Sequence, residues 1–359
     1  MAIGLDIGSS AVRVAELEHR RRGTPRLIRY GEVALSPGAV VDGDVLEPDV
    51  VAEALRELWG KTDLKGRSVA VGMASQRVTV RQIDLPDLPD DELADAVRMQ
   101  GQDQLPMPID EALLDFVVVS RYPVDEDRRN VRVLLVTAER EMVERLLAPV
   151  TTARLRPVLV DLDAFAVLRS LATVAAEDEK TEPDDARPAE VVVDIGATIT
   201  KFAVHRNGHP LFVRMVRFGG NSSTLELQQV LELDWEQAEK AKLDCCRAMA
   251  AGAELDADDE RVRVLRRGVE QAITEVRHSL DFFRSQHDDV DVQRVVLSGG
   301  ASLAPQLADQ LETALELPVA MGDALRTVDA THRRGTPGNP KEEAPFLAVP
   351  VGLALGLLR

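Results

Sequence analysis

Two short segments of the chain share a residue pattern that suits phosphate binding. Residues 6–10 read Asp-Ile-Gly-Ser-Ser and residues 194–198 read Asp-Ile-Gly-Ala-Thr, 188 residues further along. Each lies between two runs of alternating apolar residues, which predicts a β-hairpin rather than the strand-to-helix turn of a dinucleotide-binding fold. A glycine turn exposes consecutive backbone N–H groups, and no bulky side chain hinders a phosphate there. The pattern predicts two phosphate-binding hairpins.

Polar side chains at equivalent positions of the hairpins extend this prediction. Ser10 and Thr198 each offer a hydroxyl to a phosphate. Asp6 and Asp194 stand at the ends of the first strands and can hold Mg²⁺ through water, because magnesium keeps most of its hydration shell. Two such hairpins, one from each half of the chain, would clamp a triphosphate in the cleft between them.

A third glycine segment follows the strand-like residues 295–297. It reads Ser298-Gly299-Gly300 and would let the backbone lie flat against a sugar or a base. A single Asp-x-Gly at a strand end is more typical of a structural turn. Two of them in register, followed by Ser-Gly-Gly, indicate an α/β protein with the actin-like two-domain ATPase fold, which is built from ribonuclease H-like repeats.

The elements that must position these segments follow from the apolar periodicity. Apolar spacing predicts a helix over residues 48–59 and a long amphipathic helix from Val262 to Phe283. Residues 78–150 show a β-α-β-β-α rhythm, which indicates a small inserted α+β subdomain. The predicted organisation is a first actin-like domain over residues 1–77 and 151–180, the inserted subdomain over 78–150, an acidic linker over 175–190, a second actin-like domain over 191–345, and a C-terminal helix over 346–359 that packs back on the first domain.

Composition excludes several classes of protein. The formal net charge of −18 repels nucleic-acid phosphates, so we expect no nucleic-acid binding. The two cysteines, Cys245 and Cys246, are adjacent and offer neither a disulfide framework nor a spaced zinc set, and the six histidines show no metal-site spacing. No basic region followed by an apolar run opens the chain, so we expect no signal peptide. The longest apolar run, residues 346–358, is too short to span a membrane.

Longer stretches, in order along nearly the whole chain, carry a resemblance to a known family. They are residues 4–13, the stretch from Gly31 through 42–45 to Trp59, and residues 105–111, 207–212, 219–221, 236–242 and 296–301. These stretches resemble the PilM family, the actin-like proteins of type IV pilus assembly, which are related to the division protein FtsA. The resemblance implies an actin-like ATPase fold in which the inserted subdomain replaces an actin subdomain, with ATP or ADP and Mg²⁺ bound between the domains.

The resemblance also assigns roles to individual residues. Asp6 and Asp194 would lie near the Mg²⁺ ion. Glu239 and Lys242 would flank the nucleoside together with Gly299 and Gly300; the two charged residues are three apart on a predicted helix and share one face, although alone they indicate an exposed ion pair. The phosphates would contact residues of the two hairpins and a later glycine pair: Gly8, Ser9, Ser10, Arg13, Gly196, Thr198, Gly219 and Gly220.

The expected hydrolytic residue is Asp163, which follows the strand-like residues 157–161. Relatives outside the pilus family more often have a glutamate there, and the shorter side chain would hold an attacking water poorly. Lys201, the counterpart of Arg13 in the alignment of the hairpins, also departs from the resemblance, since many family members carry an uncharged residue at that position. It would contact a phosphate or cap the strand. We expect nucleotide binding with slow hydrolysis or none of use.

The resemblance implies a partner as well. In PilM-like proteins the short cytoplasmic tail of an inner-membrane protein, PilN, lies in a groove between the first domain and the inserted subdomain. Residues 78–83, 99–109 and 113–119 supply matching material here, and an extended peptide suits such a groove. The protein would then be cytoplasmic, recruited to the inner face of the membrane without inserting into it, and close to the other pilus platform and motor components. The sequence leaves a homo-oligomer open.

Two alternative functions remain open at this stage. One is a filament-forming cytoskeletal ATPase like FtsA, which requires complementary faces that a sequence does not reveal. The other is a small-molecule kinase of the same superfold, which requires a catalytic aspartate facing an acceptor pocket. The sequence contains no motif of that kind.

Overall fold

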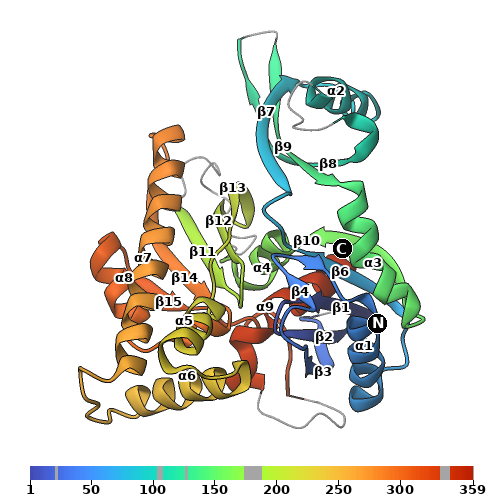
Figure 1. The fold of residues 1–359 in the computed structure, drawn as a ribbon. Helices are drawn as coiled ribbons and strands as arrows, with labels where there is room; N and C mark the ends of the chain where they lie inside the picture. The colour runs from blue at the N-terminus through green and yellow to red at the C-terminus, as the bar shows by residue number, and fades with distance from the viewer. Residues whose placement is uncertain (21–22, 103–107, 126–127, 174–187, 332–339, 359) are drawn as a thin grey trace.

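Two α/β domains and a smaller inserted unit make up the protein (Figure 1). The structure is a computed structural model that describes residues 1–20, 23–102, 108–125, 128–173, 188–331 and 340–358. The inserted unit extends from the domain that contains the N-terminus, and the two domains stand side by side beneath it in this view. The described ranges therefore include both predicted hairpins and the glycine segment at 298–300.

Each domain is built on a five-stranded sheet of the same topology. The strand order is β10-β6-β1-β2-β3 in the first domain and β15-β14-β11-β12-β13 in the second. In each sheet the first three strands of the domain are antiparallel and the last two add in parallel, which is the internal repeat that the sequence predicts. The strands are β1 (Ala2–Ile7), β2 (Ala11–Glu18), β3 (Arg26–Ala34), β6 (Ser68–Met73), β10 (Arg156–Leu162), β11 (Ala189–Ile195), β12 (Thr200–Arg206), β13 (His209–Val216), β14 (Val292–Ser298) and β15 (Val319–Met321).

Helix α1 (Pro48–Thr62) covers the first sheet where the periodicity predicts a helix. Its fixed-φ proline suits the first turn, and its residues Val51, Leu55 and Leu58 are fully buried against the core. The helix ends at Asp63, whose left-handed backbone (φ 53°) closes the last turn. The short strands β4 (Val40–Val41) and β5 (Asp44–Val45) form a small ribbon before it.

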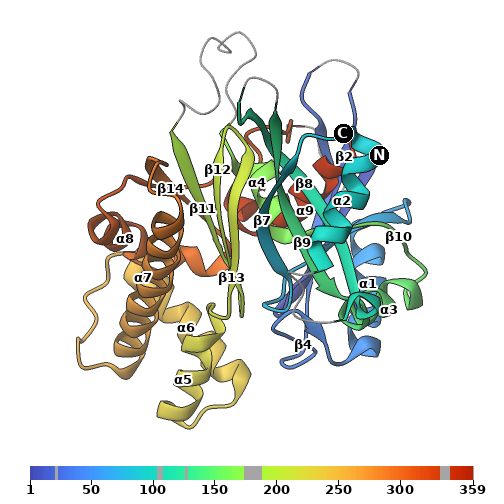
Figure 2. The same ribbon diagram turned by 90° about the horizontal axis from the view of Figure 1, so that it is seen from above.

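The inserted unit is a three-stranded antiparallel sheet with one helix on it. Strands β7 (Thr79–Pro86), β9 (Arg129–Glu139) and β8 (Ala112–Pro123) lie in that order, and helix α2 (Asp90–Gln102) and a single 3-10 turn (Ile109–Glu111) precede β8. The helix and the sheet share a small core of their own: Ile83, Leu85, Leu93, Val97, Val131, Val133 and Leu135. Met99 of the same helix is exposed. Figure 2 shows β13 of the second domain running beside this unit, where it contacts β7 and β8.

Helix α3 (Arg140–Thr152) follows the inserted sheet but packs on the first domain. Its residues Met142, Leu146 and Val150 belong to the large first-domain core, and the helix lies against α1. The apolar face of α3 is directed away from the inserted sheet because β9 is long enough to carry the chain back to that core. Helix α3 thus lies within residues 78–150, the predicted inserted subdomain, but it packs on the first domain.

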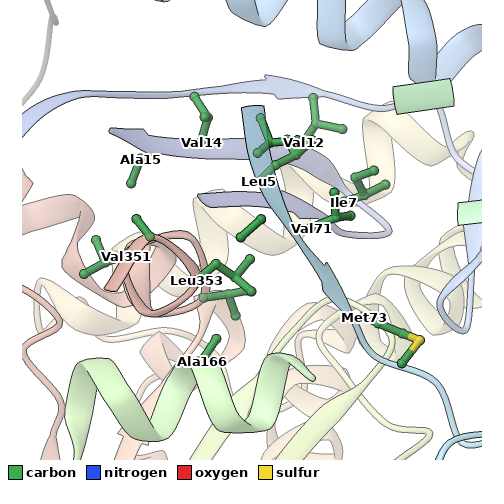
Figure 3. Packing of buried hydrophobic residues seen from close by; sticks show 14 of the residues in the cluster. Leu5, Ile7, Val12, Val14, Ala15, Val71, Met73, Ala166, Val351 and Leu353 are labelled. Carbon is green, nitrogen blue, oxygen red and sulfur yellow. The ribbon is translucent and has the colours of Figure 1, made fainter. Parts of the chain in front are cut away.

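The C-terminal helix α9 (Pro340–Gly356) fills the centre of the first domain. It contacts β1, β2 and β6 on one side and α4 (Asp163–Leu171) on the other. Figure 3 shows Val351 and Leu353 of α9 among the buried side chains of the sheet, with Ala166 of α4 below them. A helix enclosed on all sides must be apolar all round, which explains the apolar run at residues 346–358.

The second domain has four helices after β13 in the described residues, of which α7 and α8 contact its sheet while α5 and α6 pack against α7. They are α5 (Asn221–Leu231), α6 (Trp235–Ala250), α7 (Glu260–Gln286) and α8 (Leu307–Leu315). The long α7 buries Val262, Val269, Val276 and Phe283 along one stripe, as its spacing predicts. Helix α6 begins with a reciprocal capping box, in which the side chains of Asp234 and Gln237 each accept from the other's backbone N–H. That cap fixes the start of the helix that carries Glu239 and Lys242.

The predicted acidic linker falls mostly outside the described residues. The described chain stops at residue 173 and resumes at residue 188, and Ala189 and Glu190 already belong to β11. Among the helices that the structure describes, none is both long and apolar enough to cross a membrane.

Candidate nucleotide-binding site

A cavity of about 430 Å³ lies between the two domains and has both hairpins on its wall. Its volume falls within the range of small-molecule sites. Of the predicted site residues, eleven line it: Asp6, Ser10, Arg13, Asp194, Gly196, Gly219, Gly220, Glu239, Lys242, Gly299 and Gly300. The other four predicted residues, Gly8, Ser9, Thr198 and Asp163, are not among its lining residues.

The two hairpins close with the same turn. The Gly8 N–H donates to the Ala11 carbonyl at 3.1 Å, and the Gly196 N–H donates to the Ile199 carbonyl at 3.1 Å. The ladder registers also agree, since Asp6 faces Arg13 and Asp194 faces Lys201. The alignment of the two sequence segments therefore corresponds to a structural equivalence.

Arg13 stands at the edge of the first hairpin with three neighbours. Its Nη1 lies 3.8 Å from Oδ2 of Asp6, and its Nε donates to Glu32 at 3.0 Å. The guanidinium also lies over the ring of Phe346, 5.5 Å from the ring centre. Arg13 is thus held at the cavity wall mainly by groups outside the hairpin turn.

The second hairpin turn has further support from the segment that follows β13. The N–H of Gly220 donates to the Gly196 carbonyl at 3.0 Å, and the N–H of Asn221 donates to the Ala197 carbonyl at 2.8 Å. A Cβ on Gly219 would lie 2.5 Å from both carbonyl oxygens, so this close approach requires glycine. The resemblance implies Gly219 and Gly220 near the phosphates, and the structure places them directly against the turn of the second hairpin.

The tips of the two hairpins touch each other. The hydroxyl oxygens of Ser9 and Thr198 lie 2.7 Å apart and share a hydrogen bond. These two residues are not among those that line the cavity; instead their hydrogen bond joins the two domains. Ser10, the next residue, is exposed and faces the cavity.

Lys201 lies inside a cluster of carboxylates. Its Nζ is 2.9 Å from Oδ1 of Asp194 and 3.9 Å from Oδ2 of Asp163, and only 11% of the side chain is exposed. Burial alone would lower the pKa of Lys201, but Asp194, Asp163 and Asp6 outweigh burial and raise it. Lys201 is therefore a permanent cation. Burial raises the pKa of Asp6, while Lys201 and Arg13 act in the opposite direction.

Asp163 is the first residue of α4 and is almost fully buried. Burial is the largest cause that raises its pKa to about 8, and the neighbouring carboxylates add to it, so the side chain is protonated at neutral pH. Its Oδ1 has no hydrogen-bond partner and lies close to Gly72. Lys201 lines the cavity and lies beside Asp163, which is not among the lining residues.

Glu239 and Lys242 form a linked polar group on the cavity wall. Lys242 Nζ lies 2.7 Å from Glu239 and donates to Thr224 Oγ1 at 2.8 Å and to the Gly220 carbonyl at 3.2 Å. The Thr224 hydroxyl in turn donates to Glu239 at 2.6 Å. Only 12% of the Lys242 side chain is exposed, so this pair is part of the site rather than a solvated ion pair. Thr224 was not predicted, because a threonine inside a helix gives no sequence signal for such a contact.

The glycine segment at the end of β14 approaches both the second hairpin and α9. Gly299 has a φ of +85°, and a Cβ there would lie 2.3 Å from the Ile195 carbonyl. Its N–H donates to the Pro345 carbonyl at 3.1 Å, and Gly300 packs against the ring of Phe346. The start of α9 is therefore part of the cavity wall, a role that its sequence, which predicts only packing, does not reveal.

Apolar side chains form the rest of the wall on the second domain. They are suited to the face of a planar base, beside the polar group of Glu239 and Lys242. They are Leu243, Cys246, Leu265, Val269, Leu303 and Leu307.

Comparison with known families identifies the chain. Residues 4–357 match the model of the family described as type IV pilus assembly protein PilM. The chain belongs to the PilM family. The chain is similar to a solved structure of a PilM–PilN type IV pilus biogenesis complex, at 27% identity and a TM-score of 0.81 over 100% of this chain and 98% of that one. The PilM resemblance of the sequence is thereby confirmed.

More distant relatives agree on the fold. The cell division protein FtsA of Streptococcus pneumoniae serotype 2 is 25% identical over 341 residues, which cover 85% of this chain and 72% of FtsA. MreB5 of Spiroplasma citri bound to ADP matches at 11% identity and a TM-score of 0.50, over 98% of this chain and 94% of that one. With the PilM match, these confirm the actin-like two-domain α/β fold that the two hairpins and the Ser-Gly-Gly segment predict.

The expected magnesium position at Asp6 and Asp194 is not free. The Lys201 ammonium lies beside Asp194, and the Arg13 guanidinium lies beside Asp6. Across the described ranges, no group of three or more His, Cys, Asp or Glu side chains is arranged to hold a metal ion. Magnesium requires an octahedral shell of oxygens at about 2.1 Å, and the Lys201 ammonium, 2.9 Å from Oδ1 of Asp194, already engages one of the oxygens that this shell would use. The donor set present does not fit a protein-held Mg²⁺ ion.

Proposed function

We propose that this protein binds ATP or ADP in the cavity between its two domains and serves as a nucleotide-responsive scaffold of the type IV pilus assembly platform. The observation that carries the proposal is the convergence of two equivalent glycine hairpins on one cavity. Membership of the PilM family supports the pilus setting, and the ADP bound to MreB5 supports a nucleotide as the ligand of this fold.

The phosphates fit the hairpin end of the cavity. The backbone N–H groups around Gly8 and Gly196, the Ser10 hydroxyl and the cations Arg13 and Lys201 supply donors and positive charge there. Ser9 and Thr198 would reach a phosphate only if their mutual hydrogen bond opens. Closing two domains on a polyphosphate in this way couples ligand binding to the relative position of the domains.

The nucleoside fits the opposite end. Glu239 accepts hydrogen bonds and can hold ribose hydroxyls, and Lys242 reaches both Glu239 and the Gly220 carbonyl. The apolar wall beside them covers a base, and Gly299 and Gly300 allow the backbone to approach it. This assignment keeps the sugar next to the polar group and the base next to the apolar side chains.

Hydrolysis is expected to be slow. Asp163 is protonated near neutral pH and is shielded from the cavity by Lys201, so no described carboxylate is positioned as a general base for water. A protein that binds nucleotide and seldom hydrolyses it can act as a stable two-state element rather than as a motor.

The partner we propose is the cytoplasmic tail of a PilN-like inner-membrane protein, as in the solved PilM–PilN complex. One face of the inserted sheet carries half-buried apolar residues next to the first-domain core: Val80, Leu113, Val117, Val119 and Val136. Strands β7 and β8 are both edges of that sheet and can pair with an extended peptide. Of the expected groove segment 99–109, residues 103–107 lie outside the described residues. Binding there would recruit a cytoplasmic protein to the inner face of the membrane.

The nucleotide proposal is tested at Ser10, which is exposed and faces the cavity. Ser10→Glu places a negative charge where the phosphates are expected and should weaken ATP binding at least about tenfold, whereas the neutral Ser10→Gln of equal size should bind close to wild type. Calorimetric titration of the three proteins with ATP measures this. Equal affinity of Ser10→Glu and Ser10→Gln for ATP would contradict the proposal that the phosphates bind at this end of the cavity.

The partner proposal is tested on β8. Val117→Glu should abolish binding of a labelled PilN-tail peptide, measured by fluorescence anisotropy, because it puts a charge on the apolar strip. Ala94→Glu, which adds the same charge at an exposed position of α2 on the opposite face of the inserted sheet, is the matched control and should bind normally. Unchanged binding by Val117→Glu would place the tail elsewhere.

A further inference from the structure

Three cations of the cavity wall each lie beside one glycine. An ideal Cβ on Gly196 would lie 3.6 Å from Lys201 Nζ, one on Gly8 would lie 3.7 Å from Arg13 Nη1, and one on Gly220 would lie 3.9 Å from Lys242 Nζ. All three side chains line the cavity. Two of these cations, Arg13 and Lys201, belong to the hairpins at which the phosphates are proposed to bind, so positive charge for a polyphosphate is already present there.

Lys201 differs from the other two in what surrounds it. Asp194, Asp163 and Asp6 come from three elements of two domains, β11, α4 and β1, and all interact with this one ammonium group. Arg13 is shared with Glu32 and Phe346, and Lys242 with Glu239 and Thr224. Lys201 therefore occupies the centre of the carboxylate cluster, at the point where a cation would bridge the protein and the phosphates.

We propose that the Lys201 ammonium serves as the built-in counter-ion at this point, in place of a divalent cation, so that the chain binds a metal-free nucleoside di- or triphosphate. A tethered ammonium donates hydrogen bonds to Asp194 and to a phosphate oxygen at once and loses little entropy when the ligand arrives. A divalent ion entering the cluster would meet this charge within a few ångströms and would have to displace a buried side chain. The ligand identity in this inference rests on the nucleotide binding proposed above.

The test has one arm without nucleotide. Binding of Mn²⁺ to the nucleotide-free protein is followed by electron paramagnetic resonance for wild type, Lys201→Ala and Arg13→Ala. Wild type and Arg13→Ala should show no saturable site, whereas Lys201→Ala, which vacates the cluster, should gain one site per chain. Saturable binding of Mn²⁺ by wild type, or no gain in a folded Lys201→Ala, would overturn the inference.

The second arm titrates ATP into wild type by calorimetry, once with excess Mg²⁺ and once with EDTA. The Kd of wild type should change by less than about threefold between the two conditions, and this requires no variant to fold. Binding that requires Mg²⁺ overturns the inference. No binding in either condition refutes the proposed nucleotide function instead, and the manganese arm then still decides what Lys201 does.

Discussion

The two hairpins share a backbone and differ in how their charges are placed. Both turns close with the same 3.1 Å hydrogen bond, and both pair an aspartate with a cation across the ladder. In the first hairpin Arg13 contacts Glu32 and Phe346, and its Nη1 lies 3.8 Å from Oδ2 of Asp6. In the second, Lys201 is buried against Asp194 and also lies 3.9 Å from Asp163 of the other domain.

The difference shows that a repeated motif need not repeat its chemistry. The first hairpin holds its arginine mainly with Glu32 and Phe346, and the second holds its lysine between Asp194 and Asp163, which belong to different domains. The support from Gly219 and Gly220 is likewise confined to the second turn. The second hairpin is therefore the rigid half of the proposed clamp, and the first is the half that can adjust.

Removal of the two cations should have the largest and most unequal effect. Lys201→Ala leaves Asp194 buried without its counter-charge and should lower the free energy of unfolding by about 3–5 kcal/mol. Arg13→Ala, in a more exposed pair, should cost about 1 kcal/mol or less. Urea unfolding of both variants measures the contrast. Equal losses would mean that the two hairpins carry equivalent ion pairs.

Substitution of Gly8 and Gly196 by alanine compares how closely the backbone surrounds the two turns. An alanine Cβ at Gly196 would meet the Ile199 carbonyl at 2.8 Å, whereas at Gly8 the nearest atom, the Ala11 carbonyl oxygen, is 3.2 Å away. Gly196→Ala should therefore cost about 1–3 kcal/mol, and Gly8→Ala clearly less. The same urea experiment decides this, and a reversed order would contradict a more rigid second turn.

The pH dependence of stability tests the carboxylate that only the second hairpin engages. The pKa of Asp163 rises from 3.8 to about 8 on folding, so the folded state holds a proton that the unfolded state releases between these pH values. Stability from this group is present below about pH 4 and is lost as the pH rises toward 8. Asp163→Asn should reduce the downward slope by at most about 1.4 kcal/mol per pH unit. Thermal unfolding of wild type and Asp163→Asn from pH 4 to 8 measures both slopes of stability against pH, and equal slopes would contradict this prediction.

The contact between the hairpin tips should give the smallest effect. The hydroxyls of Ser9 and Thr198 are 2.7 Å apart, and a neutral hydrogen bond of this kind contributes about 0.5–1 kcal/mol. A double-mutant cycle with Ser9→Ala and Thr198→Ala should show a coupling of that size without nucleotide. A coupling that persists unchanged with ATP bound would show that the ligand does not open the tips.

Local pattern was enough to predict the hairpins, the repeat and the equivalence of Asp6 with Asp194 and of Arg13 with Lys201. These depend on neighbours along the chain and on period-two alternation. Contacts between distant elements could not be read in this way. The sequence offers no sign that Asp163 would lie against Lys201 rather than in the cavity, since that depends on how α4 of one domain meets β12 of the other.

The helices illustrate the same limit. Glu239 and Lys242 were correctly placed on one helical face, because a spacing of three residues determines it. The apolar residues of α3 and α9 predicted helices, but not that α3 would join the first-domain core or that Phe346 would reach the cavity wall. Apolar periodicity predicts that one face of a helix is buried, but the element on which that face packs depends on the tertiary structure.

The central claim, that the two unequal hairpins grip one nucleotide, is tested most directly by a crystal structure of the protein with ADP or an ATP analogue in the presence of EDTA. The account predicts phosphate oxygens within hydrogen-bond distance of both turns, at Gly8 to Ser10 and at Gly196, with Lys201 still bound to Asp194. Phosphates that contact only one of the two domains, or a ligand bound outside this cavity, would contradict it.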